Sequence, residues 1–321
     1  MRVSLTAAAC ALLHVAGAGA APEVIAHRGA SGYLPEHTLA AYALAYAQGA
    51  DWIEPDVVLA RDGVLIAAHD ITLDATTDVA ERFPARARAD GRHYAIDFDW
   101  REIETLYAIE RLPNRFPREA RFLRVPRMEQ VLDLVQGLNH TTGCRVGVYP
   151  EIKSSAFHWA AQADPERRLL QLLNSRGLSG ADDPVRIQSF EPPSLARLRE
   201  YGSAHYLVQL VDDDPNRPTP IDLAAIARYA QAISPAKTRL RREPGLVAQA
   251  HAAGLDVHTW TLRADQPGEG FASFEAELDW VRAAGIDAFF TDFPDRAARH
   301  LGTARTCVRH PSVPDTLPAT S

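Results

Sequence analysis

Two histidines and two carboxylates stand close together near the start of this chain, and their side-chain types suit acid–base chemistry. His27 opens the segment His-Arg-Gly, and His69 stands directly before Asp70; both follow apolar runs. Because an imidazole titrates near neutral pH, one ring can accept a proton while the other donates one. A single histidine at a strand end is more often structural, but two of them around an acidic cluster favour catalysis. We therefore predict that His27 and His69 form a general acid–base pair.

The acidic cluster consists of Glu54, Asp56 and Glu151. Glu54 and Asp56 are two residues apart in a predicted strand, so their side chains share one face while Pro55 points away. Glu151 ends a second apolar run. Converging carboxylates repel one another unless a cation or a proton holds them together, and an all-oxygen set favours Ca²⁺ or Mg²⁺. The alternative is that these are ordinary surface acids at strand ends, which explains one such acid better than three.

Positive and aromatic side chains beside these groups could bind an anionic substrate. Arg28 follows the first histidine, and Lys153 shares the strand face of Glu151. An Arg fork and a Lys ammonium suit a phosphate, although salt bridges to the acidic cluster would also explain them. Phe190 and Trp260 each lie at the end of a predicted strand, where they would either wall a pocket or pack into the core.

The elements that would position these residues are short apolar runs alternating with helical segments. The predicted strands cover residues 24–27, 52–59, 146–151, 185–189, 206–211, 232–235, 257–261 and 288–291. This alternation implies parallel strands with helical crossovers, and eight such units closing on themselves make a (β/α)8 TIM barrel. An open doubly wound sheet is the alternative, but the glycine-rich loop that usually follows its first strand does not occur here. In a barrel, the candidate residues would meet at the carboxyl ends of the strands.

One apolar run breaks the alternation. The segment VLIAAH follows the second strand after only RDG, which is too short for a parallel crossover. Asp62-Gly63 is a hairpin signal, so this run should fold back antiparallel and bring His69 level with Glu54 and Asp56. The next residues, about 71–125, are polar, Arg-rich and punctuated by proline. We interpret them as a subdomain inserted over the barrel mouth, with an N-capped helix in DFDWREIETL.

The two ends of the chain differ in composition from the part between them. Residues 1–21 combine one Arg, a short apolar run and an Ala-x-Ala pattern, which is typical of a secretory signal peptide. The barrel domain should then span residues 22–310, and residues 311–321 should form a flexible tail. Export predicts a periplasmic or secreted protein, in which Cys144 and Cys307 could pair. No other apolar run is long enough to cross a bilayer.

Composition limits the kinds of partner. With 321 residues, 46% hydrophobic content and a net charge of −7, the chain can bury a large core. Its charge gives no general attraction to nucleic acid or to an anionic membrane. A small anionic substrate is compatible with this charge if local cations such as Arg28 and Lys153 bind it. The sequence is compatible with a monomer or with a homodimer.

The segments HRGASGYLPEHT, GADWIEPDV, RDG, HD and PEIK occur in this order, and together they resemble the glycerophosphodiester phosphodiesterase family. The form PEHT, the segments TTDVAERFP and DGRHYAIDF, and the leader are most similar to its secreted, periplasmic bacterial branch. The resemblance implies a TIM barrel with an insertion after the second histidine. It also implies metal-dependent hydrolysis of glycerophosphodiesters, such as glycerophosphocholine or glycerophosphoethanolamine, to sn-glycerol 3-phosphate and an alcohol.

The same resemblance implies roles by position. The two histidines match the family's acid–base pair, and the three acids match its ligands for a divalent ion, typically Ca²⁺ in the periplasmic branch. Arg28 and Lys153 match its phosphate-contacting positions. The chain departs from the usual pattern at Pro55, Ala60 and Ala75, and none of these three is a proposed catalytic residue.

Two other functions are alternatives. A phospholipase C- or D-like phosphodiesterase on a related barrel would cleave intact lipid, which needs an apolar rim; the Arg-rich insertion gives little sign of one. A non-catalytic secreted binding protein on the same barrel would tolerate the loss of a histidine or a carboxylate, yet both histidines and all three acids are present.

Overall fold

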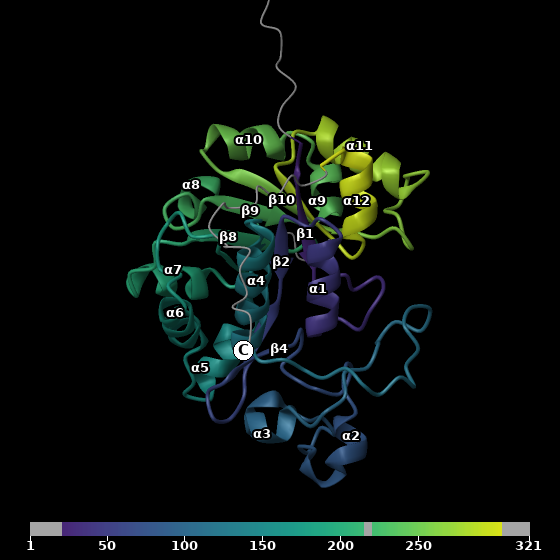
Figure 1. Ribbon diagram of the computed structural model, residues 1–321. Helices are drawn as coiled ribbons and strands as arrows, with labels where there is room; N and C mark the ends of the chain where they lie inside the picture. Colours follow the sequence, from purple (N-terminus) through teal and green to yellow (C-terminus); the bar gives the residue numbers. More distant parts are fainter. Residues whose placement is uncertain (1–20, 215–219, 304–321) are drawn as a thin grey trace, which may run out of the picture.

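The strands of the protein close into a ring of parallel segments. The computed structural model describes residues 21–214 and 220–303, and its strands form one sheet (Figure 1). The final strand pairs with the first, from Glu23↔Ala288 to Ala26↔Thr291. The predicted (β/α)8 barrel is confirmed, with strands β1 (Glu23–His27), β2 (Trp52–Glu54), β3 (Asp56–Leu59), β5 (Gly147–Val148), β6 (Glu151–Ile152), β7 (Arg186–Ser189), β8 (Tyr206–Val211), β9 (Ala232–Pro235), β10 (Asp256–Leu262) and β11 (Ala288–Thr291).

Two prolines divide strands of the ring. Pro55 separates β2 from β3, and Pro150 lies between β5 and β6. Proline has no N–H to give to a ladder, but its carbonyl still accepts. The Glu151 N–H donates to the Pro55 carbonyl at 2.9 Å, and the Gln188 N–H donates to the Pro150 carbonyl at 3.0 Å. Because β2 pairs with β5 and β3 pairs with β6, the divided segments stay in the same ring.

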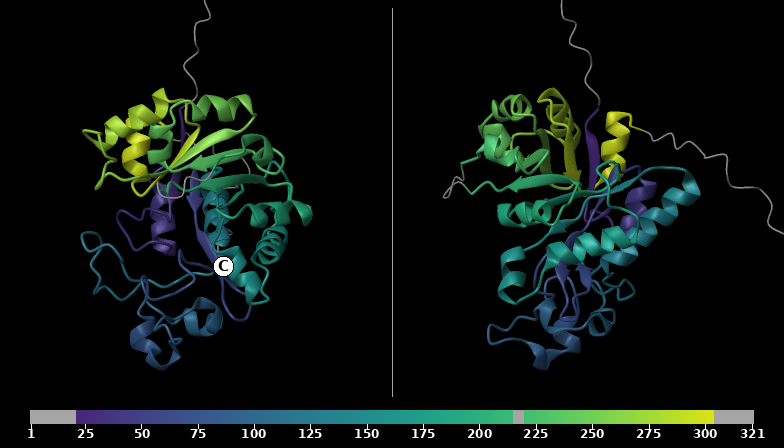
Figure 2. Two further views of the ribbon diagram at one scale, coloured as in Figure 1. Left: turned by 180° about the vertical axis from the view of Figure 1, so that it is seen from behind. Right: turned by 90° about the vertical axis from the view of Figure 1, so that its left-hand side faces the viewer.

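Helices cover the outside of the ring (Figures 1 and 2). Outward-pointing strand residues such as Val24, Val57 and Ile187 pack with the helices in one large apolar cluster, whereas a smaller apolar cluster that includes Ile25, Tyr149 and Phe290 fills the interior. No helix in the described ranges is both long enough and apolar enough to span a membrane. The helices of the barrel are α1 (Leu39–Ala47), α4 (Met128–Thr142), α5 (Ser155–Ala160), α6 (Pro165–Ser175), α7 (Pro192–Glu200), α8 (Leu223–Ile226), α9 (Lys237–Arg242), α10 (Leu246–Ala252), α11 (Phe274–Ala283) and α12 (Pro294–Leu301).

The predicted hairpin is present. β4 (Leu65–Ala67) runs antiparallel to β3, with Val58 opposite Ile66. Gly63 in the turn has φ of 78°, a conformation that glycine adopts without strain. The Ala68 N–H donates to the Asp56 carbonyl at 3.1 Å, so the hairpin places the next residue, His69, beside the acidic strand segment as expected.

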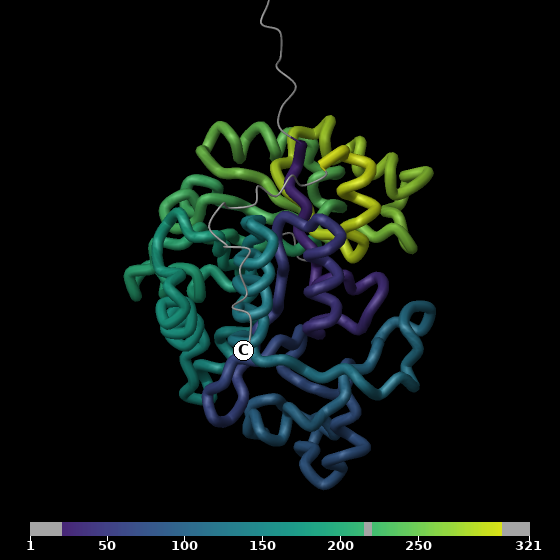
Figure 3. Tube along the Cα trace, in the orientation of Figure 1, coloured from purple at the N-terminus to yellow at the C-terminus, as the bar shows by residue number. Residues whose placement is uncertain are grey.

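The inserted segment after the hairpin has an apolar core of its own. It holds α2 (Val79–Arg82), α3 (Trp100–Ile103) and the 3₁₀ turns η1 (Pro84–Arg86) and η2 (Ala95–Asp97), and lies at one side of the barrel (Figures 1 and 3). The predicted N-cap is confirmed, because Asp99 and Glu102 form a capping box at α3. Buried side chains of the insertion pack against the face of the hairpin that Asp56 shares, so the cluster joins Val58, Ala60, Ile66 and Ala68 of the hairpin to Leu73, Val79, Ala95, Phe98, Ile103, Leu106 and Val125 of the insertion.

Replacing Phe98 with Ala should loosen the insertion while sparing the barrel. Phe98 is fully buried, its ring lies 5.5 Å from that of Phe83, and the Arg86 guanidinium lies 4.4 Å above it. A buried Phe→Ala change typically costs about 3–5 kcal/mol. Hydrogen exchange followed by mass spectrometry should show lost protection in residues 71–125 and retained protection in the barrel strands. Phe122→Ala is the control, because Phe122 is 63% exposed; equal patterns in the two variants would contradict a separate core.

Candidate functional site

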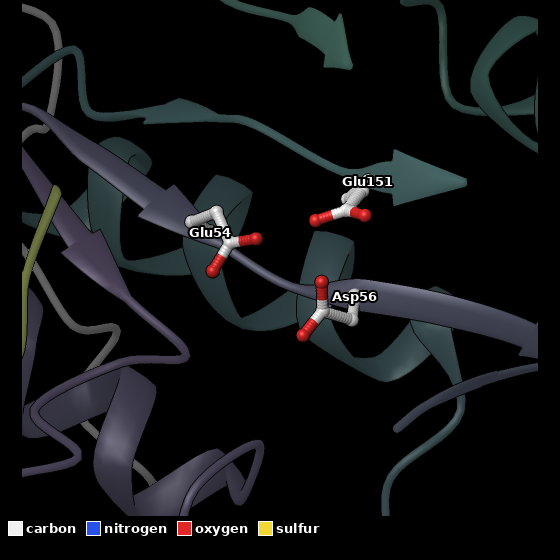
Figure 4. A group of neighbouring side chains, drawn as sticks. All are labelled: Glu54, Asp56 and Glu151. Atoms are coloured by element: carbon white, nitrogen blue, oxygen red, sulfur yellow. The ribbon is translucent and has the colours of Figure 1, made fainter. Parts of the chain in front are cut away.

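Three carboxylates from neighbouring strands converge on one space. Glu54 ends β2, Asp56 begins β3 and Glu151 begins β6, with Asp56 opposite Glu151 in the register. Their ligand oxygens lie within 4.8 Å of one another, and all three residues are buried. Figure 4 shows the carboxyl groups facing one another. The structure therefore brings the predicted acidic cluster together.

Two cations face these carboxylates. The Lys153 ammonium lies 2.8 Å from Glu151 Oε1 and 3.9 Å from Asp56 Oδ1. The Nε atom of Arg28 lies 3.2 Å from Asp56 Oδ2, and its backbone N–H donates to Glu54 Oε2 at 2.8 Å. Three carboxylates against two cations leave one excess negative charge, so one shared proton, or a bound cation, is needed to balance the cluster.

Burial and mutual repulsion determine which carboxyl group holds that proton. Burial and the charge of Asp56 raise the pKa of Glu54 well above its usual value. Burial also raises the pKa of Glu151, to about 8. Burial acts in the same direction on Asp56, but Lys153 and Arg28 bring the pKa of that carboxyl well below its usual range. Of the three carboxyl groups, Asp56 therefore favours the ionised form, whereas Glu54 and Glu151 both favour the protonated form.

The donor atoms of this cluster fit a hard divalent cation. Carboxylate oxygens are the ligands that Ca²⁺ and Mg²⁺ prefer. Gln188 on β7 lies opposite Glu151 in the register, and its Nε2 donates to Glu54 Oε1 at 3.1 Å. Its buried Oε1 has no hydrogen-bond partner within the ranges that the structure describes. A buried carbonyl without a partner beside three carboxylates is the kind of group that a cation or a substrate hydroxyl would satisfy.

A tight turn after β1 holds Arg28 against the cluster. Arg28 has φ of 59°, which is uncommon for a residue with a side chain, and Gly29 has φ of 84°. A Cβ at Gly29 would lie only 2.8 Å from the backbone of α1, so the close approach requires glycine. Glu36 Oε1 accepts from Arg28 Nη1 at 2.9 Å, and His37 Nε2 lies 2.9 Å from Asp56 Oδ2. Both supporting residues belong to the PEHT segment before α1.

The first histidine forms a buried pair with a carboxylate. His27 ends β1, and its Nδ1 lies 2.6 Å from Oδ1 of Asp292, which directly follows β11. Burial and Arg28 lower the pKa of His27 to about 4, although Asp292 acts in the opposite direction. Burial raises the pKa of Asp292, but His27, Arg263 and Arg115 bring it well below its usual range. When burial keeps the ring neutral, an ionised Asp292 at Nδ1 favours the Nδ1–H tautomer, whose Nε2 is free to accept a proton.

The second histidine and the two aromatic residues lie at the same cavity. His69 Nδ1 lies 2.7 Å from Asp70 Oδ1, so each candidate histidine has an aspartate partner. The rings of Phe190 and Trp260 meet edge to face with their centroids 5.6 Å apart. The structure places both at the cavity wall, where they can touch a ligand. The cavity has a volume of about 140 Å³, and its lining includes His27, Arg28, Glu54, His69, Glu151, Lys153, Gln188, Phe190, Trp260 and Arg263.

Several residues of the site were not predicted. Asp292 carries a usable signal, because it follows the strand at 288–291 as the other acidic residues follow theirs. Gln188 lies inside a predicted strand that neighbours the one ending at Glu151, and its polarity in an apolar run is a second signal. No local signal marks Arg115, whose contact with Asp292 joins positions 177 residues apart.

Comparisons with known proteins agree with this geometry. A family model described as the glycerophosphoryl diester phosphodiesterase family matches residues 27–296, a range that contains every predicted site residue. A glycerophosphodiester phosphodiesterase of Haemophilus influenzae is 35% identical, and the alignment covers 87% of this chain and 89% of the relative. A glycerophosphodiester phosphodiesterase of Treponema pallidum is 32% identical, with 90% of this chain and 94% of the relative covered.

Solved structures share the fold. A glycerophosphodiester phosphodiesterase from Agrobacterium tumefaciens superposes with a TM-score of 0.61 at 26% identity, covering 87% of this chain and 99% of that one. A phosphodiesterase from Oleispira antarctica, solved in complex with the product sn-glycerol-3-phosphate, superposes with a TM-score of 0.68. It is 21% identical and covers 88% of this chain and 97% of that one, so this likeness concerns the fold alone.

Proposed function

This chain belongs to the glycerophosphoryl diester phosphodiesterase family, and from that membership we propose that it hydrolyses small, soluble glycerophosphodiesters to sn-glycerol 3-phosphate and an alcohol. It is a phosphodiesterase, as the resemblance in its motifs predicted. The observation that carries the substrate proposal is one cavity lined by two histidines, two acidic residues and three cations. At about 140 Å³ it is much smaller than the roughly 300–1,000 Å³ of sites for drug-sized ligands, which favours a small diester over intact lipid. The relatives from Haemophilus influenzae and Treponema pallidum, both named glycerophosphodiester phosphodiesterases, support this proposal.

The acidic cluster would hold the divalent ion, and we favour Ca²⁺ over Mg²⁺. Ca²⁺ accepts roughly six to eight oxygen ligands in flexible geometry, whereas Mg²⁺ demands a near-ideal octahedron. Glu54, Asp56 and Glu151 would be the ligands, and the free carbonyl of Gln188 lies beside them. When bound, such an ion offsets the negative charge that builds on the phosphate in the transition state. Arg28 and Lys153 would bind the phosphate oxygens and orient the scissile bond.

The two histidines would then move protons on opposite sides of the phosphate. Neutral His27 would take a proton from the attacking group, which is either water or the free hydroxyl of the substrate's glycerol. Asp292 would stabilise the imidazolium that forms. His69 would donate a proton to the leaving alcohol as the P–O bond breaks. If the glycerol hydroxyl attacks, a cyclic phosphate forms first, and water opens it afterwards.

Release of glycerol 3-phosphate tests the proposal. Purified protein with Ca²⁺ should release it from glycerophosphocholine and leave micellar phosphatidylcholine intact. Cleavage of the micellar lipid without turnover of the soluble diester would instead indicate the phospholipase-like alternative. No turnover of either compound would indicate the binding-protein alternative.

We also infer that the protein is exported, on the strength of its leader sequence. Residues 1–20 lie outside the described residues, as do Cys307 and the tail at 311–321, so the disulfide to Cys144 and the tail stay predictions, and so does a homodimer. N-terminal sequencing of the periplasmic fraction tests export: the mature chain should begin next to Ala18, Ala20 or Ala21. An intact leader on cytoplasmic protein would contradict it.

A further inference from the structure

An irregular part of the insertion returns to the catalytic end of the barrel through one arginine. Arg115 lies among exposed residues such as Pro113 and Asn114, yet only 6% of its own side chain is exposed. Its Nη2 lies 2.7 Å from Asp292 Oδ2, and its Nε lies 2.9 Å from Asp265 Oδ2. Burying the guanidinium of such a loop is costly unless the contacts are specific. These contacts therefore define a docked position for the insertion.

Two separate contacts of Arg115 lead to His27. Asp292 receives Arg115 at Oδ2 and holds the His27 ring through Oδ1 at 2.6 Å. Arg115 Nη1 also donates to the Ser31 carbonyl at 3.0 Å, and Ser31 Oγ donates to the His27 carbonyl at 2.7 Å. The Arg115 guanidinium thus fixes the Asp292 carboxylate, which holds the His27 ring. It also fixes the turn at Ser31, which holds the backbone of the same histidine.

We propose that Arg115 is a positioning residue for His27, so that the inserted subdomain completes the acid–base pair of the barrel. The inference rests on the proposed function. Arg263 also reaches Asp292 Oδ2, with its Nε at 2.9 Å, but it comes from the barrel itself and lines the cavity. Without Arg115, Asp292 keeps Arg263 as a charged partner. It loses the second contact, from a different side, that stops its carboxylate from rotating. Misplacement of a reacting group by about 1 Å can cost about 100-fold in rate.

A second arginine of the insertion offers an internal comparison. Arg111 Nε lies 2.6 Å from Glu36 Oε2, and Glu36 Oε1 binds Arg28. Arg111 therefore supports the residue assigned to phosphate binding, whereas Arg115 supports the residue assigned to proton transfer. Loss of Arg111 should mainly raise KM, and loss of Arg115 should mainly lower kcat.

The test uses the full-length mature protein with R115A, R115K and the control R121A. Arg121 belongs to the same insertion, and its contacts are exposed: an ion pair with Glu81 at 3.2 Å and a hydrogen bond to the Arg118 carbonyl at 3.0 Å. R115A should lower kcat for glycerophosphocholine by about 10- to 100-fold with KM within about threefold of wild type. Millimolar guanidinium should restore part of the kcat of R115A, and R115K, which lacks the fork, should be intermediate. R121A should match wild type.

A spectroscopic measurement shows whether Arg115 orients the His27 ring or only stabilises the fold around it. In protein with ¹⁵N-labelled histidine, the ring signals of His27 should report a single Nδ1–H tautomer in wild type and R121A, and exchange broadening in R115A.

A kcat of R115A within about threefold of wild type would overturn the proposal. So would a lost kcat without guanidinium rescue and with unchanged His27 signals. If R115A does not fold, the kcat and the His27 ring signals of R115K decide whether the proposal holds. If wild type does not turn over the substrate, the proposed function fails, and the His27 signals still show whether Arg115 positions the ring.

Discussion

Replacing His27 or His69 with Ala should lower kcat for glycerophosphocholine by about 10²- to 10⁴-fold, the usual contribution of a general acid or base. Each ring has its own aspartate partner and lines the same cavity, so neither can replace the other. Far-UV circular dichroism should show an unchanged fold. His251→Ala is the matched control, because His251 lies on α10 and pairs with Asp287 at the surface.

The leaving group should distinguish the two histidines. A glycerophosphodiester of p-nitrophenol needs little protonation of its leaving oxygen, because p-nitrophenolate is already stable near neutral pH. This substrate should restore much of the turnover of His69→Ala and none of that of His27→Ala. Equal responses of the two variants would contradict the assignment of base and acid. Full activity of both variants on glycerophosphocholine would contradict the pair itself.

Removing divalent ions with EDTA should abolish turnover, and Ca²⁺ should restore it. Calcium should also raise Tm, because an ion at about 100 times its Kd stabilises the folded state by about 2.7 kcal/mol. Burial raises the pKa of Glu151 to about 8, so a proton competes with the ion and the affinity should fall as the pH falls below that value. Calorimetry in buffers of different ionisation enthalpy would measure the proton that is released. Indifference to EDTA would contradict a metal role for the cluster.

Glu151→Gln should separate ion binding from stability. In this variant two carboxylates face Arg28 and Lys153, so the cluster is neutral without a proton and the metal-free protein should be at least as stable as wild type near neutral pH. The variant should nevertheless lose turnover and the Ca²⁺-dependent rise in Tm. Glu277→Gln is the comparison, because Glu277 is a buried partner of Lys237 at 2.8 Å and lies outside the cluster. This variant should be less stable than wild type, but it should keep turnover and the Ca²⁺-dependent rise in Tm. A Ca²⁺-dependent rise that persists in Glu151→Gln would remove that residue from the ligand set.

The barrel could be predicted because its strands are buried on both faces and therefore appear as short apolar runs. The predicted ranges 206–211, 232–235 and 288–291 coincide with β8, β9 and β11. The ranges 52–59 and 146–151 were predicted as continuous strands, whereas the structure divides them at Pro55 and Pro150. The hydrophobic pattern does not indicate this division. The prolines themselves do, because a proline has no N–H to donate to the strand ladder.

The candidate site was predictable where local geometry sets it. The two-residue period of a strand places Glu54 and Asp56 on one face, and the short RDG turn brings His69 back to them. Arg115 could not be found in this way, because its place depends on how an irregular loop docks on a barrel end that is built from distant segments. Asp292 is an intermediate case. The sequence shows that it follows a predicted strand, but not that it pairs with His27.

Pro55 and Pro150 have a consequence for how the site responds to ion exchange. Each proline adjoins a carboxylate and holds its own φ close to one value, so the spacing of the ligand oxygens is limited by covalent rings as well as by packing. Such a frame has little conformational entropy left to lose when an ion enters, and little to regain when it departs. The barrel should therefore release and recapture its ion without local unfolding, with an empty form whose backbone already has the shape of the loaded one.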